Sequence, residues 1–393
     1  MTTMTTRTIL RQVFLRSLAT AFTRRQVLRR RPPDKPENIL LIRPDHLGDV
    51  LFTTPALRVL RQALPDARIT YLVGPWARAV VEHDSAVDEV ITCEFPGFQR
   101  RPQRWPGEPY RTLLRVRDQL APYNFDTSVN LRFDFYWGAL LAQVCGIPRR
   151  IGYDIASCRP FLTDRVAYAP GRHEVEQNLT LISGIIDTPS NLCSPRLEYD
   201  PGEPARAAAL DFVREHGIGP NDPLVAIHPG SGAYIKSWTA QGWAQVADSL
   251  HFRDGAAILF TGSKAEEGLV EEIVGLMKAK AISAAGATSL PQLAALFEHC
   301  RLVLGVDSGP LHLAVAMGTP TVLLFGPSDD RAFGPWGDSE WHKVVRAACD
   351  CAPCGKLDFT PQEAVGHDCM RAISVDDVLA AAAPLLARSR TEV

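Results

Sequence analysis

The stretch RLVLGVDSGPLHLAVAMG, residues 301–318, decides the fold of this chain. Its apolar beginning, Arg301 to Gly305, predicts a buried strand of a parallel sheet. Its apolar end predicts a helix, because Pro310 is typical of a first helical turn and Gly318 of the residue beyond the last turn. The stretch is therefore a strand–turn–helix unit, and repetition of such units is typical of an α/β fold.

Three small or polar residues, Asp307, Ser308 and Gly309, occupy the turn between that strand and that helix. Open α/β sheets bind ligands at this edge, and a helix start offers unpaired N–H groups and a positive dipole end to an anion. The alternative is that Asp307 and Ser308 only cap a core helix, since Asp and Ser are common N-cap residues. The residues by themselves leave both interpretations open.

Length and proline content divide the chain. At 393 residues it exceeds one ordinary hydrophobic core, which favours two domains. Proline is frequent from Pro195 to Pro223, which is typical of a linker. We expect, in order, a basic leader over residues 1–36, a first Rossmann-like domain over 37–195, a linker over 196–222, a second Rossmann-like domain over 223–372 and a C-terminal helix over 373–393.

Strands alternate with helical stretches in both domains, which predicts an α/β fold of two doubly wound parallel sheets. In the first domain, short apolar runs predict strands over residues 38–43, 68–73, 89–92, 127–131 and 149–153. In the second, they predict strands over residues 224–227, 256–260, 301–305 and 321–325. No GxGxxG follows the first strand and no Walker motif is present, which disfavours a dinucleotide oxidoreductase and a P-loop enzyme.

Basic residues are concentrated at the start of the chain. Residues 1–36 contain eight Arg and one Lys against one Asp, whereas the formal net charge of the whole chain is −2. The remainder is therefore acidic, which argues against a nucleic-acid-binding protein. Apolar residues recur at helical spacing among these arginines. This pattern favours an amphipathic helix over residues 7–31 on an anionic membrane surface, with a solvated leader as the alternative.

The nine cysteines favour a reducing compartment, because an odd number spread through a long βα chain does not suit a disulfide framework. We therefore expect a cytoplasmic location, and no apolar run reaches the length of a membrane-spanning helix. Four cysteines are clustered, namely Cys349, Cys351, Cys354 and Cys369. Their spacing is compatible with zinc, and reduced structural thiols are the alternative.

Small and polar residues follow three predicted strands of the second domain. The first loop is His228-Pro229-Gly230-Ser231-Gly232, in which glycine lets backbone amides approach a phosphate closely. Lys236 follows it and offers a positive charge to that phosphate, with a simple turn as the alternative. The second loop contains Thr261 and Gly262, and the third is the Asp307 turn. Because parallel strands end at one edge of a sheet, we expect these loops to bind a nucleotide diphosphate together.

Two charged residues follow predicted strands of the first domain. Asp49 comes after the strand over 38–43, and a carboxylate there is a candidate general base toward a hydroxyl group. The alternative is that Asp49 caps the helix that contains Leu57. Arg132 comes after the strand over 127–131 and is a candidate for binding an anionic acceptor. An ion-paired surface arginine is the alternative there.

Four stretches carry a resemblance to a known family. They are Ile39–Leu57 (ILLIRPDHLGDVLFTTPAL), His173–Leu179 (HEVEQNL), His228–Trp238 (HPGSGAYIKSW) and Val306–Gly337 (VDSGPLHLAVAMGTPTVLLFGPSDDRAFGPWG). In this order and spacing they resemble glycosyltransferase family 9, the ADP-heptose:lipopolysaccharide heptosyltransferases and their relatives. The resemblance extends from Asn38 to the end of the chain. It implies the GT-B architecture, in which two Rossmann-like domains face a cleft.

The resemblance also implies roles for domains and residues. The first domain binds the acceptor and the second binds the sugar nucleotide. Asp49 is then the base in an inverting transfer, and Lys236 contacts the diphosphate or the donor sugar. The loop around Thr288 meets the nucleotide base. The element Asp-Ser-Gly-x-x-His binds the donor through Asp307, Ser308, Gly309, Leu311 and His312.

Substrates and location follow from the same resemblance. The donor is a heptose on a nucleotide diphosphate, ADP by family default, and the acceptor is a lipid-linked or cell-envelope glycan at the inner face of the plasma membrane. No further cofactor and no metal is implied, because Lys236 and the amides of Ser308 and Gly309 would face the leaving diphosphate. A catalytically silent sugar-nucleotide- or glycan-binding protein and a sugar-nucleotide epimerase are alternatives with the same layout.

Overall fold

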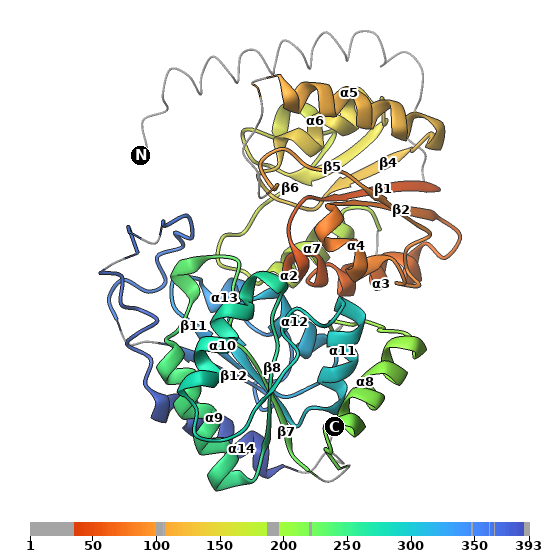
Figure 1. Ribbon diagram of the computed structural model, residues 1–393. Helices are drawn as coiled ribbons and strands as arrows, with labels where there is room; N and C mark the ends of the chain where they lie inside the picture. The colour runs from red at the N-terminus through yellow and green to blue at the C-terminus, as the bar shows by residue number, and fades with distance from the viewer. Residues whose placement is uncertain are drawn as a thin grey trace. The chain divides into compact units, whose positions relative to one another are not determined.

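The computed structural model describes residues 35–99, 105, 107–186, 196–219, 222–346, 349–360, 362–364 and 366–388. The amphipathic helix expected over residues 7–31 lies outside these described residues. The described residues form two compact units, which are drawn in Figure 1. The division assigns Met1–Pro170 and Val175–Pro195 to unit 1, and Gly171–Glu174 and Arg196–Val393 to unit 2.

Unit 1 is built on a parallel sheet with β1 near its centre. Across the described residues the strand order is β3-β2-β1-β4-β5-β6. The strands are β1 (Asn38–Arg43), β2 (Arg68–Val73), β3 (Glu89–Thr92), β4 (Thr127–Asn130), β5 (Arg149–Tyr153) and β6 (Asp164–Val166). Residues 39–42 of β1 are completely buried, as expected for a strand covered on both faces.

Helices cover both faces of this sheet. In Figure 1, α5 (Glu108–Leu120) and α6 (Tyr136–Val144) lie on one face, and α3 (Thr54–Ala63), α4 (Arg78–Val81) and α7 (Glu174–Ser183) lie on the other. The short helix α2 (Leu47–Leu51) follows β1 directly and packs against α4. Asp49 therefore lies in the first turn of α2, one short loop beyond the carboxyl end of β1.

Unit 2 repeats this design with β7 and β10 at its centre. Across its described residues the strand order is β12-β11-β10-β7-β8-β9, and every pairing is parallel. The strands are β7 (Leu224–His228), β8 (Ala257–Phe260), β9 (Ile282–Ser283), β10 (Leu302–Val306), β11 (Thr321–Phe325) and β12 (His342–Arg346). The expectation of two doubly wound parallel sheets is confirmed.

Two groups of helices enclose the sheet of unit 2. One group is α9 (Ala240–Asp254), α10 (Glu267–Leu276) and α14 (Val375–Ala387), and the other is α8 (Glu203–Glu215), α11 (Leu290–His299) and α12 (Gly309–Ala316). The short helix α13 (Asp330–Phe333) follows β11. Short 3₁₀ helices occupy Pro75–Ala77, Ala121–Tyr123, Arg159–Phe161, Tyr234–Lys236 and Lys264–Glu266. Helix α8 falls within the expected linker, yet it packs against α11 and is joined to it by the Arg206–Glu298 ion pair at 3.1 Å.

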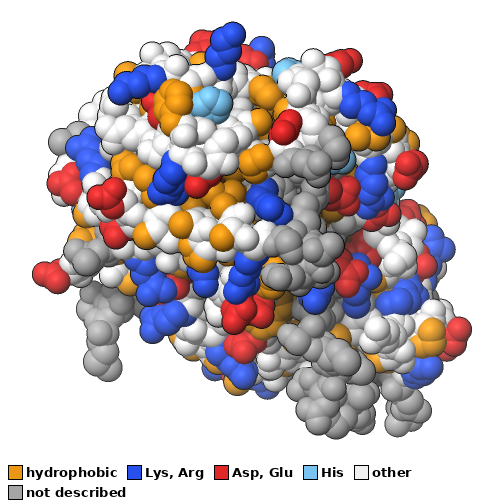
Figure 2. Space-filling model, turned by 90° about the horizontal axis from the view of Figure 1, so that it is seen from below, with side chains coloured by type: hydrophobic (Ala, Val, Ile, Leu, Met, Phe, Trp, Pro, Cys, Tyr) orange, Lys and Arg blue, Asp and Glu red, His pale blue; other side chains and the backbone are white. Residues whose placement is uncertain are grey.

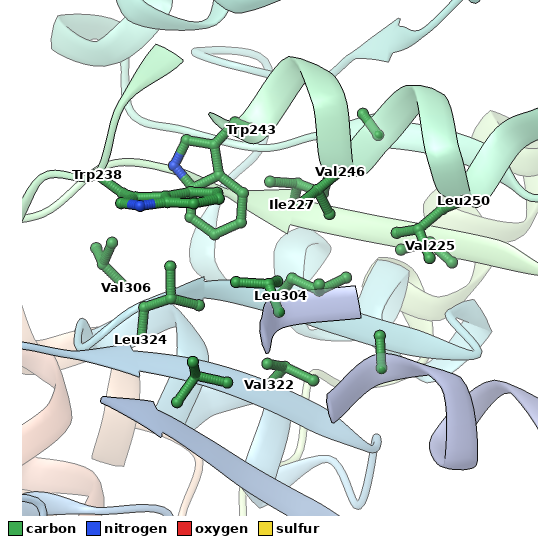
Figure 3. Packing of buried hydrophobic residues seen from close by; sticks show 14 of the residues in the cluster. Val225, Ile227, Trp238, Trp243, Val246, Leu250, Leu304, Val306, Val322 and Leu324 are labelled. Atoms are coloured by element: carbon green, nitrogen blue, oxygen red, sulfur yellow. The ribbon is translucent and has the colours of Figure 1, made fainter. Parts of the chain in front are cut away.

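The core of unit 2 is anchored by two tryptophans, shown in Figure 3. The rings of Trp238 and Trp243 meet edge to face, with centroids 4.9 Å apart and planes at 87°. Aromatic pairs favour this geometry because the positive edge of one ring meets the negative face of the other. The indole N–H of Trp238 donates to the carbonyl of Ile373 at 3.2 Å, so the loop before α14 is fixed to this core.

The strands that the sequence did not predict are short strands at sheet edges. They are β6, β9 and β12, which end one or other sheet. β9 has two residues and β6 has three, and β12 begins with His342 and Lys343 and so lacks a continuous apolar run. An edge strand has a neighbour on one side alone and needs less apolar surface, so hydrophobic patterning gives it little signal.

The described surface carries charges of both signs. On the face shown in Figure 2, acidic and basic side chains are interspersed among hydrophobic ones. Among the described helices, none combines the length and the hydropathy needed to cross a bilayer.

The opening stretch requires glycine at Gly305. In the parallel pairing of β10 with β7, Gly305 is the partner of His228. A Cβ atom at Gly305 would lie 2.5 Å from the carbonyl oxygen of His228 and 2.4 Å from Cδ2 of Leu311. Both contacts are far shorter than van der Waals distance, and one of them is to backbone that cannot rotate away. Glycine here lets β10, β7 and α12 pack closely.

We therefore expect Gly305→Ala to lower the free energy of unfolding of unit 2 by roughly 1–3 kcal/mol, the usual cost of overpacking. The matched control is Gly268→Ala in the exposed part of α10, where a Cβ would meet no atom within 4 Å. That change should raise stability by up to about 1 kcal/mol, because Ala favours helix over Gly. Urea denaturation followed by tryptophan fluorescence measures both. Equal stabilities for the two variants would contradict the packing argument.

Candidate functional site

The loops that end β7, β8 and β10 lie together in unit 2. These three strands are neighbours in the sheet, and the direction of winding reverses between β7 and β10. Such a switch point is where open α/β sheets bind ligands. The contacts agree with this, since Nδ1 of His228 and Oγ1 of Thr261 are 3.0 Å apart. The prediction that these loops share one edge is confirmed.

His228 and Thr261 support the loops from beneath. Both are buried, and Thr261 has no exposed surface. Burial lowers the pKa of His228, although nearby Glu266 opposes the effect. The imidazole is therefore neutral at pH 7. Thr261 was predicted to contact the sugar-nucleotide donor. In the structure its hydroxyl instead contacts the buried imidazole of His228, below the Gly-rich loop.

A buried ion pair joins two of the predicted donor residues. Nζ of Lys236 lies 2.6 Å from Oδ2 of Asp307, with 16% and 8% of their side chains exposed. Nε2 of His312 lies 3.5 Å from the other oxygen of Asp307. Burial alone would raise the pKa of Asp307, but the hydrogen bond from His312 and the charge of Lys236 outweigh it, so its pKa lies below the usual range. Asp307 is therefore a carboxylate throughout the physiological range.

The start of α12 faces the same edge. Ser308 occupies the N-cap position, but its side chain makes no capping hydrogen bond, and Asp307 is engaged with Lys236. The alternative that these two side chains only cap the helix is therefore wrong. Oγ of Ser308 is buried and has no hydrogen-bond partner among the described atoms. Pro310 has no N–H group, and the amide of Leu311 donates to the carbonyl of Ser308 at 3.1 Å. The amides of Ser308 and Gly309, together with this hydroxyl, therefore form the set of donors suited to an anion.

The remaining predicted donor residues differ in what they expose. Gly230 lies so close to Glu266 that a Cβ would meet its carboxylate at 2.0 Å, and Oγ of Ser231 accepts a hydrogen bond from the amide of Ala233 at 3.2 Å. Leu311 is fully buried and packs on Gly305, so its side chain belongs to the core. Gly232, Gly262, Thr288 and Gly309 lie in the segments that directly follow β7, β8, β9 and β10, so they are at the same edge of the sheet.

Asp49 lies at the corresponding edge of unit 1. It follows β1, and the winding of that sheet reverses between β1 and β4, so Asp49 is also beside a switch point. Its side chain is 32% exposed and lies 3.5 Å from Nη2 of Arg43. The alternative that Asp49 caps the helix containing Leu57 is wrong, because that helix begins at Thr54 with Thr53 as its N-cap residue.

Arg132 is ion-paired at the end of β4. Its guanidinium contacts Asp45 and lies 2.7 Å from Asp134, and it stacks over Phe98 at 5.1 Å. The sequence had left this arrangement open as the alternative to binding an acceptor. Side-chain exposure of 28% leaves one part of Arg132 accessible, and the acceptor role stays a prediction.

Sequence reasoning missed Arg43 and Asp45, which are both buried behind Asp49. Nε of Arg43 lies 2.6 Å from Oδ2 of Asp45. The available signal was an arginine that follows four apolar residues at the end of a strand and precedes an acid two residues later. Charged residues are rarely buried unless they are paired, so this pattern indicates an internal ion pair.

The clustered cysteines are reduced in this structure. Sγ atoms of Cys349 and Cys351 lie 3.4 Å apart, and their hydrogen bond raises the pKa of Cys351 to about 11. Cys369 is buried. Across the described part of the chain, no three metal-ligating side chains converge in a geometry that would hold an ion.

Comparison with known proteins gives a consistent result. Residues 98–360 match the profile of glycosyltransferase family 9 (heptosyltransferase). Lipopolysaccharide heptosyltransferase 3 of Escherichia coli is 28% identical over 300 residues, which cover 74% of this chain and 84% of that protein. The structure of a family 9 glycosyltransferase from Veillonella parvula is similar with a TM-score of 0.75 and 28% identity, covering 90% of this chain and 98% of that one. The Escherichia coli ADP-heptose lipopolysaccharide heptosyltransferase II shares the fold, with a TM-score of 0.68 and 23% identity over 89% and 98% of the two chains.

The buried pair makes a prediction about stability. Asp307→Asn leaves the Lys236 ammonium buried without its counter-ion, which should cost on the order of 3 kcal/mol. Lys236→Met combined with Asp307→Asn removes both charges, so the double variant should be more stable than Asp307→Asn alone. Because the folded pKa of Asp307 is depressed, the contribution of the pair is present above about pH 4 and is lost as the pH falls further. A double-mutant cycle by urea denaturation at pH 7 measures the coupling, and strictly additive effects would refute it.

Proposed function

This chain belongs to glycosyltransferase family 9 and is a glycosyltransferase, and from that premise we propose that it moves a heptose from ADP-heptose to a hydroxyl group of the lipopolysaccharide core with inversion. The names of its relatives supply the substrate classes. The observation that carries the proposal is the Lys236–Asp307 pair beside the start of α12, at a switch point of the unit 2 sheet.

Donor binding is assigned to unit 2. A diphosphate carries its charge on exposed oxygens, and Lys236 with the amides of Ser308 and Gly309 and the hydroxyl of Ser308 would supply complementary donors. Asp307 is a carboxylate and would repel a phosphate in contact with it. Its role is therefore to hold and neutralise the Lys236 ammonium while the site is empty. The Gly-rich loop over residues 228–232 would let backbone come close to the same phosphates.

The chemical step is a displacement at the anomeric carbon. Asp49 removes the proton from the acceptor hydroxyl as its oxygen attacks the anomeric carbon from the face opposite the nucleotide. The bond between that carbon and the diphosphate oxygen breaks, and ADP departs with the electron pair. Attack from the opposite face inverts the configuration. Lys236 and the α12 amides meet the negative charge that develops on the leaving diphosphate, which lowers the barrier.

The acceptor is proposed to be a phosphorylated core sugar of lipopolysaccharide at the inner face of the membrane. Arg132, at the carboxyl end of β4, would bind an anionic group of such a glycan. The basic residues within 7–31 would add attraction to anionic lipid, worth about 1 kcal/mol for each Lys or Arg near the surface.

Turnover with defined substrates tests this function. We expect the full chain to release ADP and elongate truncated lipopolysaccharides when given ADP-heptose, and to do so more slowly with UDP-glucose. The anomeric configuration of the product is read by NMR and should be inverted. With the acceptor in anionic vesicles, removal of residues 1–34 should slow transfer more than it does with detergent-solubilised acceptor. Binding of ADP-heptose without turnover on any acceptor would instead support a silent sugar-nucleotide-binding protein.

Two variants should separate binding from chemistry. Asp49→Asn should keep the dissociation constant for ADP-heptose but lower kcat by about 100-fold or more, as expected for loss of a general base. Lys236→Ala should weaken ADP-heptose binding by roughly 10- to 100-fold, the value of a hydrogen bond to a charged group. Isothermal titration and steady-state kinetics measure the two effects. Normal transfer by Asp49→Asn would remove the base assignment, and unchanged donor affinity in Lys236→Ala would remove the phosphate contact.

A further inference from the structure

Asp49 is the outer end of a chain of charges that runs into unit 1. Nη2 of Arg43 lies 3.5 Å from Oδ1 of Asp49, and Nε of the same guanidinium lies 2.6 Å from Asp45. Asp45 in turn contacts Arg132 with its other oxygen. The two middle members are buried and the two outer members are partly exposed, so the buried pair stands behind the residue that is proposed to do the chemistry.

The position of Arg43 is fixed on several sides. It is the last residue of β1, and 3% of its side chain is exposed. Nη1 donates to the carbonyl of Leu131 at 2.9 Å and lies 3.5 Å from Oδ1 of Asn178. Asn178 is itself held, because it donates to the carbonyl of Phe52 at 3.1 Å. A planar guanidinium with this many contacts has little freedom to rotate, so it presents Nη2 to Asp49 in a constant direction.

We propose that Arg43 is a positioning residue that keeps the Asp49 carboxylate ionised and oriented for the acceptor hydroxyl. This rests on the proposed function, in which Asp49 is the base. At 3.5 Å the contact is an ion pair and is longer than a good hydrogen bond, so its action on Asp49 is mainly Coulombic. An opposite charge within about 4–6 Å favours the charged form of a carboxylate.

Other titratable groups lie on the loop and the elements around Asp49. Asp45 and His46 lie on the same loop, and His46 stacks on Trp76 with ring centroids 5.4 Å apart. Burial raises the pKa of Tyr71 on β2, so that phenol is neutral. Arg78 of α4, the helix packed against α2, is paired with Glu82 at 2.9 Å. Among the ion pairs of the described residues, the one with Arg43 places a cation 3.5 Å from Asp49.

Asp45 has a separate purpose in this arrangement. When Asp49 takes a proton from the acceptor it becomes neutral, and Arg43 loses one of its two carboxylate partners. A guanidinium cannot release its own proton in a protein, so it would then be a buried cation without compensation. Asp45, whose Oδ2 lies 2.6 Å from Nε of Arg43, is the second partner and offsets this cost. Asp45 also contacts Arg132, the residue predicted to bind the acceptor. One carboxylate therefore connects Arg132 to Arg43, which positions Asp49.

The test measures Asp49 directly and needs no substrate. In protein labelled with ¹³C at Asp carboxyl carbons, the Asp49 signal is identified by its loss in Asp49→Asn, and its titration midpoint is followed by NMR. We expect Arg43→Gln to raise that midpoint by about one pH unit or more. Arg43→Lys keeps the charge and should restore most of the wild-type value. Arg78→Gln, on the neighbouring helix, is the matched control and should leave the midpoint unchanged.

Kinetics add a second, independent readout. Arg43→Gln should lower kcat with ADP-heptose and truncated lipopolysaccharide at least tenfold, leave the KM for ADP-heptose unchanged, and move the acidic limb of the kcat profile to higher pH. The limb moves upward because a carboxylate with a higher pKa becomes ionised at a higher pH. Arg43→Lys should recover part of kcat, since an ammonium cannot contact Asp45, Leu131 and Asp49 at once as a fork does.

The outcomes separate the two proposals. An unchanged Asp49 midpoint in Arg43→Gln, or no rescue by Arg43→Lys, overturns the role of Arg43 whatever the activity. A shifted midpoint together with undiminished transfer by Asp49→Asn supports the contact and refutes Asp49 as the base. Should Arg43→Gln fail to fold by circular dichroism, the wild-type titration decides. A cation acting on Asp49 must hold its midpoint below about 3.9, the value of a free aspartate, and a midpoint at or above that value overturns the proposal.

Discussion

The parallel pairing of neighbouring strands is the constraint on which this structure depends. Pairing of β10 with β7 is so close at Gly305 that no side chain fits between the two backbones. Because the strands run in the same direction, their carboxyl ends are at one edge of the sheet, and the loops that follow them lie side by side. Residues separated by 71 positions in the chain, Lys236 and Asp307, thereby form a 2.6 Å ion pair. The chemistry of unit 2 is a consequence of that geometry.

The same logic operates in unit 1 with different residues. There the winding reverses between β1 and β4, and the loops after these strands bring Asp45 to Arg132. In both units a carboxylate near a switch point lies against a cation, Asp307 against Lys236 and Asp49 against Arg43. The cations differ in kind. Lys236 is a flexible point charge that can leave Asp307 for a phosphate, whereas Arg43 is a rigid fork held on several sides. This difference matches the roles proposed for them, since one must move toward a ligand and the other must keep a base in place.

Burial strengthens the electrostatic interactions of these charged side chains, but removing the charges from water costs free energy. An isolated ion in the interior of a protein is strongly disfavoured, so each one here is accompanied by a partner. Asp307 is shared by Lys236 and His312, and Asp45 is shared by Arg43 and Arg132. Neutral groups complete the frame, as where the uncharged imidazole of His228 meets the hydroxyl of Thr261. Apart from Lys236, which moves to a phosphate in the proposed function, these side chains have fixed partners before any substrate binds, and such preorganisation is the condition for electrostatic stabilisation of a transition state.

Local sequence determined the central strands, the strand–turn–helix units and the candidate residues at the turns, because apolar runs and helix-terminal residues are local signals. The bounds of β1, β2, β3, β5 and β11 follow from these runs residue by residue. Tertiary structure decided everything that depends on burial and on distant partners. In the tertiary structure the Asp307 side chain pairs with Lys236 and does not cap a helix. Thr261 contacts the buried His228, and α8 packs against α11 of unit 2. The tertiary structure also showed Arg43 and Asp45 as a buried pair. The sequence pattern at the end of β1 only indicates such a pair, and the distance of 2.6 Å between the two side chains shows that water has been replaced by an opposite charge.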